Sequence, residues 1–400
     1  MIGVVELNSF DDLARIRETW RELWEATPGA TFFQSWDWLR SYWRLNSDGQ
    51  QLKVLLFTLR ARPIGIVPLV VRPLPSPLGK IPALTWPLQD YGAFYGAIGP
   101  NPAATLTAAF RYLASARRDW AVIDLPHIDE FGADNGRTRN ALRNARLKSR
   151  QTNMVLFPTV DLGDSWDCYL DELPLTNRSQ YIQAEQLASQ YGKLSFHRWR
   201  PEGSESGETE RRHDLFGQFR DLKQQSTSQN ANADRELRLI EDVHPAAVDA
   251  GVVDLCTLCV GGVPAASSYG YATNGTLELL FVEAPGNNGD LMHAVLLSHL
   301  IRDSFMRNDR RILFQPRNAP AAKLWANSAA AAVTLSWFSK LSPKAQALKM
   351  KRGTGPVYDV PRREAHRPQV VRPAATQTAR GEKPEDLEVA ARKLKIYQPS

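Results

Sequence analysis

The stretch "VDLCTLCVGGVPAASSYG" at residues 253–270 consists of two apolar runs joined by Gly261 and Gly262. An earlier stretch, "VLLFTLRARPIGIVPLVV" at residues 54–71, has the same form, with Arg60-Ala61-Arg62 in the place of Val260-Gly261-Gly262. Runs rich in β-branched residues on both sides of a short turn predict a β-hairpin in each case. The chain therefore contains two copies of one structural unit.

Each hairpin is followed by further extended sequence, then a helix, then an apolar strand. The helix and strand are "PAATLTAAFRYLASARRD" and "WAVIDLP" in the first copy, and "GDLMHAVLLSHLIRDSFMRND" and "RRILFQP" in the second. This β-β-α-β repeat predicts an α+β fold of two tandem halves, each a mixed sheet flanked by helices, rather than one continuous wound sheet. We expect domains at 1–155 and 156–342, with the join near 151–166, and a C-terminal tail at 343–400.

The aromatic stretch "TFFQSWDWLRSYWR" at residues 31–44 raises the choice between an exposed binding platform and the buried face of a helix. At 100° per residue the apolar side chains of Trp36, Leu39, Tyr42 and their neighbours fall on one arc, and the charged side chains fall on the other. Ser35 stands where it can cap the first turn. We predict a core helix, because wide apolar faces usually pack against a core.

Composition predicts a globular protein with a neutral body and a basic tail. The net charge is +6, but residues 343–400 alone carry an excess of seven Lys and Arg, so the remaining chain is close to neutral. The tail is rich in Pro and Arg and is expected to be disordered. A solvated tail is the simpler interpretation, and an acidic partner for it is the alternative.

Neither a metal site nor membrane insertion is expected. Cys256 and Cys259 lie three apart on a predicted strand, so they point to opposite faces and are interpreted as buried structural cysteines. His293 and His299 are six apart on a helix, which does not bring two imidazoles to one metal. The N-terminus lacks a basic start followed by an apolar run, and no window approaches a membrane span, so we expect a cytoplasmic protein.

The ordered series of features resembles a known family. The aromatic helix at 31–44, the hairpin at 54–71, "QDYG" at 89–92, the second hairpin and "NNGDLMHAVL" at 287–296 are similar to the GNAT-superfamily acetyltransferase-like proteins of the cellulose-biosynthesis (CelD) type. These are related in architecture to the FemAB aminoacyl and peptidyl transferases. Over residues 25–340 the resemblance implies two tandem GNAT-like folds. It also implies a donor, which is an acyl-CoA, with acetyl-CoA favoured, or an aminoacyl-tRNA. The implied acceptor is an amine or a sugar hydroxyl, as in polysaccharide or cell-envelope synthesis.

The resemblance implies that the donor's pyrophosphate lies against the loop and helix start in "LELLFVEAPGNNGDLMHAVLL" at 277–297. Glycines allow close turns, and free N–H groups at a helix N-terminus attract phosphate. Side-chain amides add donors. The expected donor-binding residues are Gly286, Asn287, Asn288, Gly289 and Leu291. A plain Asn-Gly turn before a capped helix is the alternative, since Asp290 is acidic and no Lys or Arg lies between Thr276 and Ile301.

Proton transfer and acceptor binding have separate candidates. Glu283, at the strand end beside the donor loop, and Tyr269, on the preceding strand, are the catalytic candidates. Asp90 and Tyr91 in "WPLQDYGAFYGAIGP", together with Tyr271, are the candidates for binding the acceptor, a small molecule or a glycan. Each has a structural alternative: a solvated strand-end Glu, packed tyrosines, and an Asp-Tyr-Gly turn.

A second transferase reading rests on "RTRNALRNARLKSR" at 137–150, which has six basic residues and no acid. The spacing of Arg139, Arg143, Arg146 and Arg150 predicts one helical face, which would suit a phosphate-rich partner: CoA, tRNA or membrane lipid headgroups. A solvated helix face is its bland alternative. A catalytically silent tandem GNAT fold acting in binding or assembly is the third reading. The sequence lacks a Gly-Lys-Ser phosphate loop and a Gly-x-Ser-x-Gly elbow, the main support for P-loop ATPases and α/β-hydrolases.

Overall fold

The computed structural model describes residues 2–88, 92, 94–130, 132–204, 207–226 and 231–353. The elements of the first half are β1 (Ile2–Leu7), α1 (Phe10–Arg15), α2 (Arg17–Glu25), η1 (Phe32–Gln34), α3 (Trp36–Asn46), β2 (Gln51–Leu52), β3 (Val54–Leu59), β4 (Arg62–Val67), β5 (Val70–Ser76), β6 (Gly79–Thr85), α4 (Pro102–Ser115), β7 (Val122–Ile128) and α5 (Arg137–Asn144).

The second half runs from a long strand to a short terminal helix. Its elements are β8 (Arg150–Asp161), α6 (Trp166–Glu172), α7 (Leu175–Gln190), β9 (Leu194–Trp199), α8 (His213–Ser226), α9 (Ala231–Asp249), β10 (Val253–Val260), β11 (Val263–Thr273), β12 (Thr276–Glu283), α10 (Gly289–Met306), β13 (Arg311–Phe314), η2 (Pro316–Asn318), α11 (Ala319–Ala322), β14 (Ser328–Phe338) and α12 (Pro343–Gly353).

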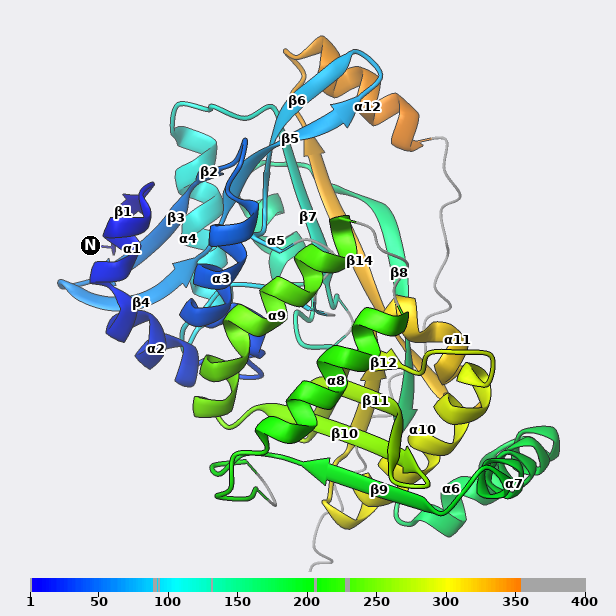
Figure 1. The fold of residues 1–400 in the computed structure, drawn as a ribbon. Coiled ribbons are helices and arrows are strands. Elements are labelled where there is room, and N and C mark those ends of the chain that lie inside the picture. The colour runs from blue at the N-terminus through cyan, green and yellow to red at the C-terminus, as the bar shows by residue number, and fades with distance from the viewer. Residues whose placement is uncertain are drawn as a thin grey trace, which may run out of the picture. The chain divides into compact units, whose positions relative to one another are not determined.

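The strands form two sheets (Figure 1). Three strands make a small sheet in the order β1-β3-β4, and eleven make a mixed sheet in the order β2-β5-β6-β7-β14-β8-β13-β12-β11-β10-β9. Helices flank the sheets, so the expected α+β class with mixed sheets is confirmed. The large sheet places strands from both halves of the chain in one hydrogen-bonded array.

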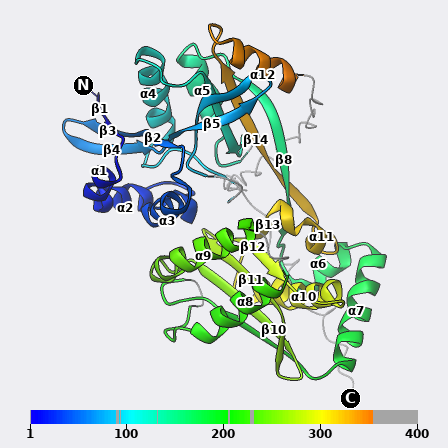
Figure 2. The same ribbon diagram turned by 45° about the horizontal axis from the view of Figure 1, so that its top comes forward.

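The two long strands β8 and β14 join the halves (Figure 2). They pair with each other antiparallel from Thr159 and Ser328 to Arg150 and Ser336, while β14 also pairs with β7 and β8 with β13. The sequence predicts a separate sheet in each half, and here the structure differs. Pairing between strands more than 160 residues apart leaves no local pattern to detect. The expected domain join at residue 155 falls inside β8.

The predicted repeat is present in both halves. Positive φ angles at Arg60 and Ala61 form the turn of the β3–β4 hairpin, and Gly261 and Gly262 do so for β10–β11. In each copy a helix then connects two parallel strands, β6 to β7 through α4 and β12 to β13 through α10. The hairpins of the two copies belong to different sheets: β3 and β4 lie in the small sheet, whereas β10 and β11 lie in the large one. Pro68, which has no N–H to donate, stands between β4 and β5.

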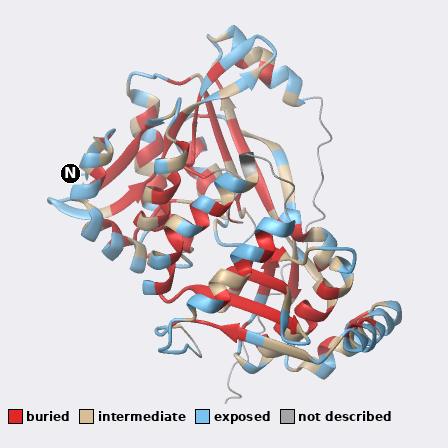
Figure 3. Cartoon of the chain, viewed as in Figure 1, coloured by how far each residue is buried: buried red, intermediate tan, exposed pale blue. Residues whose placement is uncertain are grey.

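The aromatic stretch forms a core helix, as predicted. In α3 the Ser35 hydroxyl accepts the Trp38 amide at 3.1 Å, and Trp38, Leu39 and Tyr42 are almost fully buried. Buried residues follow the strands and the inner faces of the helices (Figure 3). Cys256 and Cys259 on β10 are buried free thiols, as expected.

The predicted arginine face over 137–150 is wrong. Helix α5 ends at Asn144, because Arg146 adopts a φ of 59° and Leu147 returns its amide to the carbonyl of Leu142. Arg150 already belongs to β8. Arg139 pairs with Glu130, with Nη2 2.7 Å from Oε2. The four arginines therefore do not share a helical face.

The tail that the sequence predicts to be disordered from residue 343 starts with a helix. Residues Pro343–Gly353 form α12, which buries Ala345 and Leu348 against Ile81, Val122 and Phe338. Two apolar residues three apart give the helix one packed face, which the overall Pro and Arg content of the tail conceals. The rest of the tail, 354–400, lies outside the described residues. Among the described helices, none is long and apolar enough to cross a membrane.

Candidate functional site

The loop between β12 and α10 turns where the sequence places glycines. Gly286 has a φ of 88°, a region that L side chains rarely adopt. A side chain on Gly289 would put its Cβ 2.6 Å from the carbonyl oxygen of Ala284. The amide of Gly289 donates to the Gly286 carbonyl at 3.2 Å, and that of Met292 donates to Asn288 at 3.0 Å. Both glycines are therefore needed for this bend.

The first turn of α10 keeps open amides. Asn288 stands at the N-cap but its side chain makes no capping bond, and the amides of Asp290 and Leu291 have no protein acceptor within the described residues. The exposed Asp290 does not cap the helix either. In the first copy, by contrast, Asn101 caps α4 by accepting the Ala104 amide at 3.1 Å. Only the second copy thus presents an uncapped helix start, which attracts anions.

The two parallel strands beside this loop separate. Their pairing ends at Leu279 and Phe314, while β12 continues to Glu283. The Asn318 side chain donates to the carbonyls of Leu279 and Leu280 at 3.1 and 3.2 Å and so fixes the point of separation. Beyond it, in the part of the chain that the structure describes, no strand pairs with β12 on that side.

His293 ties the end of β12 to α10. Burial lowers the pKa of the His293 imidazole, and the charge of Asp290 and the contact of the ring with the Val282 backbone oppose that shift. His293 of α10 therefore lies against the end of β12, a contact that its sequence position alone does not reveal.

Glu283 lies in a buried charge cluster at the end of β12. Lys223 of α8 donates to its carboxylate at 3.1 Å and lies 3.6 Å from Glu236 of α9. The Lys223 ammonium is also 3.8 Å from the centre of the Phe281 ring. Burial raises the pKa of Glu283, and the positive charge of Lys223 opposes that shift.

The sequence prediction missed Lys223, although a signal was present. Lys223 follows Leu215 and Phe219 at spacings of four on the buried face of α8. A charged residue at an apolar position of an amphipathic helix indicates a buried partner of opposite charge. Glu283 is that partner.

Tyr269 and Tyr271 lie on one face of β11, as predicted, but both are buried in the core. The Tyr269 hydroxyl lies 3.1 Å from Nδ1 of His244, and burial raises the pKa of the phenol. Tyr271 packs edge-on against Phe32 and Trp38. Both rings thus contribute packing to the site. Asp90 and Tyr91 lie outside the described residues.

A cavity of about 380 Å³ adjoins the end of β13. It draws its walls from β7, β8, β14 and the residues after β13, and is lined by Pro126, His127, Asn153, Val155, Phe157, Gln315, Pro316, Arg317, Ala332 and Thr334. Arg317 connects it to the charge cluster, since its guanidinium donates to Glu236 at 2.6 Å and lies 5.3 Å from the Phe281 ring centre. His127 has a φ of 58°, which is uncommon outside glycine but is adopted by histidine more often than by most residues.

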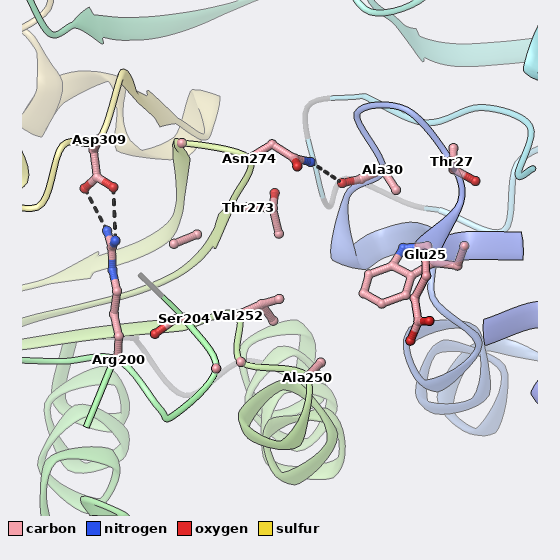
Figure 4. Close-up of a pocket in the computed structure, with 15 residues that line it drawn as sticks. Glu25, Thr27, Ala30, Arg200, Ser204, Ala250, Val252, Thr273, Asn274 and Asp309 are labelled. Carbon is pink, nitrogen blue, oxygen red and sulfur yellow. Dashed lines mark hydrogen bonds and ion pairs between the residues drawn. The ribbon is translucent and has the colours of Figure 1, made fainter. Parts of the chain in front are cut away.

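A second cavity, of about 420 Å³, lies beside Arg200 and Asp309 (Figure 4). The Arg200 guanidinium donates to both carboxylate oxygens of Asp309, at 3.0 and 2.7 Å, and to Asp254 at 2.6 Å. Each of its three nitrogens thus donates to a buried carboxylate. None of the residues predicted for the site lines this cavity. We interpret the cluster as structural.

Comparison with known proteins supports the GNAT assignment at the level of the domain. Residues 177–320 match the family model described as "Acetyltransferase (GNAT) domain". No curated protein sequence matches the chain.

Among solved structures, FemX is similar to 80% of this chain over 96% of its own length, with 9% identity and a TM-score of 0.51. The C-terminal domain of a putative lysylphosphatidylglycerol synthetase from Agrobacterium fabrum matches at 10% identity over 85% of this chain and 96% of its own, with a TM-score of 0.45. A tandem GNAT protein from the clavulanic acid biosynthesis pathway matches at 12% identity over 86% of this chain and 100% of its own, with a TM-score of 0.43. The likeness to FemX concerns the fold alone.

Proposed function

We propose that the protein transfers an acyl group from acyl-CoA to an amine or a sugar hydroxyl, with acetyl as the favoured acyl group. The observation that carries this proposal is the uncapped start of α10, where the amides of Asp290 and Leu291 stay open behind the Gly286 bend. The GNAT domain match over 177–320 covers this loop. The resemblance to the CelD-type proteins adds polysaccharide or cell-envelope synthesis as the setting.

The donor would lie along the second half of the chain. Its pyrophosphate would accept hydrogen bonds from the open amides, and the exposed side chains of Asn287 and Asn288 would add donors. Leu291 and the open edge of β12 beyond Leu280 would follow the rest of the carrier toward Glu283. Because Asp290 brings a negative charge to this position, affinity must come mainly from the amide dipoles.

The transfer needs one proton acceptor at the nucleophile. The acceptor's nitrogen or oxygen would attack the acyl carbonyl, its proton would pass to Glu283, and the C–S bond would break to release CoA as a thiolate, which takes up a proton. Lys223 would hold the Glu283 carboxylate in place at 3.1 Å. We assign Tyr269 and Tyr271 to supporting β11, because both side chains lie in the core.

The acceptor would enter the cavity lined by His127 and Arg317. Its polar wall can bind hydroxyl or amino groups, and Arg317 links it to the cluster that holds Glu283. Asp90 and Tyr91 remain proposed acceptor contacts on the basis of the resemblance. The nearest described aromatic residue after them, Phe94, has its ring centre 6.1 Å from that of Phe157 in the cavity wall.

Two alternatives remain as outcomes of the test. FemAB-like transfer from aminoacyl-tRNA has lost the continuous arginine face that favoured it, since α5 ends at Asn144. A catalytically silent binding or assembly protein would leave the α10 amides without a ligand. The first predicts binding that falls steeply with salt, and the second predicts no binding of CoA.

The repeat offers a matched pair of variants for the experiment. Asn288→Asp places a carboxylate at the start of α10, where it would repel pyrophosphate and can accept the open amides. Asn101→Asp makes the same change at the capped start of α4. Thermal unfolding is measured for both variants and the wild type with acetyl-CoA, CoA and total tRNA.

Ligand at ~100 times its Kd stabilises the native state by about 2.7 kcal/mol. We expect acetyl-CoA and CoA to raise the Tm of the wild type and of Asn101→Asp, and to leave Asn288→Asp unchanged. If no CoA compound shifts the wild type, the silent alternative holds. A Tm shift with tRNA alone favours the FemAB-like alternative. Equal Tm shifts with CoA in the two variants would show that the donor does not bind at the start of α10.

A further inference from the structure

The outward face of α12 and the turn between β5 and β6 form a basic surface with protruding apolar side chains. We call this surface the α12 platform and define it by Leu78, Lys80, Leu341, Lys344, Lys349, Met350 and Lys351. It lies apart from the donor loop and from both cavities, because none of its residues lines them. The proposed transferase chemistry therefore does not use it.

The inner face of α12 is firmly attached. Ala345 and Leu348 are buried, and Arg352 donates to Asp124 Oδ2 at 3.2 Å. Arg150 of β8 hydrogen-bonds to the carbonyl of Lys349 and lies 5.3 Å from the ring centre of Phe338. These contacts fix which side of the helix faces solvent.

The outward face carries its apolar groups in full view. At 100° per residue Met350 points nearly opposite to the buried pair Ala345 and Leu348, with Lys349 and Lys351 on its two sides. Met350 is 69% exposed, Leu341 just before the helix is 95% exposed, and Leu78 at the β5–β6 turn is 55% exposed. Lys344 donates to the carbonyl of Lys80 at 3.3 Å, which brings that turn to the helix.

Among the described residues, the chain segments around the platform are rich in Lys and Arg and contain no acid. The stretches 69–88, 143–152 and 339–353, which meet through the contacts of Lys344 and Arg150, contain eleven Lys and Arg and no Asp or Glu. Of the neighbouring acids on β7 and just before it, Asp124 pairs with Arg352 and Asp119 with Lys53. The described residues therefore give this surface an excess of positive charge.

We propose that the α12 platform docks the protein on the surface of a bilayer that contains anionic lipids. Lysines on both sides of an exposed apolar residue are the arrangement of an interfacial helix, whose cations meet headgroup phosphates while its aliphatic groups enter the acyl boundary. Single-stranded nucleic acid would instead require stacking rings, and the platform contains no aromatic residue. Leu78, Leu341 and Met350 have no role on a nucleic acid and a clear one in lipid.

Flotation of the full chain with vesicles tests the proposal. We expect binding to mixed phosphatidylglycerol and phosphatidylcholine vesicles and none to pure phosphatidylcholine. The triple variant Lys344→Glu, Lys349→Glu, Lys351→Glu should lower the vesicle affinity by roughly a hundredfold or more. The pair Leu341→Ser, Met350→Ser should lower it by roughly tenfold with its charge unchanged. Far-UV circular dichroism and Tm report that these exposed substitutions leave the fold intact.

The control is a triple variant with the same charge change on exposed residues elsewhere in the second half: Lys193→Glu, Arg302→Glu, Lys323→Glu. It should keep most of the affinity, and both triple variants retain the basic residues of 354–400. Equal losses in the two triple variants, or full binding by the platform triple, would overturn the proposal. The proposal would also be overturned if the protein did not bind vesicles, whether or not it bound total tRNA.

Discussion

Lys223 donates to the carboxylate of Glu283 at 3.1 Å, and the two side chains, from α8 and β12, are only 5% and 14% exposed. A buried carboxylate held by one lysine is fixed in place and can still take up a proton. This pair connects the fold to the proposed chemistry, because each side chain holds the other at the end of β12.

Replacing Glu283 should stop transfer without stopping donor binding. With Glu283→Gln we expect kcat to fall by ~100-fold to 10,000-fold, the usual contribution of a general base, while the affinity for CoA stays unchanged. Steady-state release of CoA across a panel of amines and amino sugars measures the first quantity, and calorimetry measures the second. Glu236→Gln is the matched control, since Glu236 also faces Lys223, at 3.6 Å.

The pH dependence of that rate has a definite direction. Burial raises the pKa of Glu283 above its usual range. The carboxylate is the active form, so kcat should rise as the pH increases through this raised pKa and level off above it. A Glu283→Gln profile that keeps the same rising limb would assign the limb to another group.

His244 should make the protein sensitive to acid. Its ring stacks on Phe216 at 3.7 Å, and burial lowers its pKa to about 4. The unfolded chain takes up this proton near pH 6.5 and the folded chain only near pH 4, so stability is lost as the pH falls between these values. The loss is about 3 kcal/mol at most. Urea unfolding at pH 7.5, 5.5 and 4 measures the effect.

His244→Gln removes the titrating ring and should flatten that part of the stability curve, although the variant is less stable at neutral pH. The exposed His197 provides the control: the stability curve of His197→Gln should be the same as that of the wild type. An unchanged slope in His244→Gln would mean that another group titrates.

Asp254 should be among the costliest single polar substitutions. It accepts hydrogen bonds from Arg198 at 2.8 Å and Arg200 at 2.6 Å, is fully buried, and has its pKa held far below its usual range by these two arginines against the effect of burial. Asp254→Asn leaves two buried guanidinium groups short of a negative charge and should lower the free energy of unfolding by about 3–5 kcal/mol. Chemical denaturation measures it.

A surface pair gives the scale for that measurement. Asp249 and Arg211 form an exposed ion pair at 2.8 Å. Asp249→Asn should change the free energy of unfolding by less than about 1 kcal/mol. Similar effects of the two substitutions would mean that the Asp254 cluster is solvated in solution.

Gly289→Ala should distort the donor loop. The new Cβ would lie 2.6 Å from the Ala284 carbonyl, so the backbone must move and the amides of the first α10 turn with it. We expect the response of Tm to CoA to disappear. Gly217→Ala in α8, where the added methyl group meets nothing within 4 Å, is the control and should raise stability by about 0.5–1 kcal/mol with CoA binding intact. Retained CoA binding in Gly289→Ala would contradict the proposed donor site.

Local patterns predicted what depends on neighbouring residues. The α3 helix, its Ser35 cap, both hairpins and the burial of Cys256 follow from periodicity and turn chemistry within windows of about a dozen residues. The bend before α10 follows for the same reason, since Gly286 and Gly289 mark a turn before a helix, while its role in donor binding stays a prediction.

Features that depend on distant residues escaped the sequence. Pairing of β8 with β14 depends on strands from opposite ends of the second half, and no spacing announces it. The end of α5 lacks the usual glycine, because Arg146 itself adopts the positive φ. Lys223 is a different case: its position on an apolar helix face was informative, but its partner Glu283 lies 60 residues away.

The shared strands β8 and β14 have a consequence for how this repeat can be taken apart. A cut at residue 155 would split β8 and leave each fragment with an unpaired strand edge, so we expect that neither copy folds as an independent domain. The two copies should melt in one cooperative step, and separately expressed pieces should regain order only on mixing. If the chain arose by duplication of a shorter ancestor, that ancestor had to complete its sheet within one chain or by pairing strands with a second copy in a homodimer.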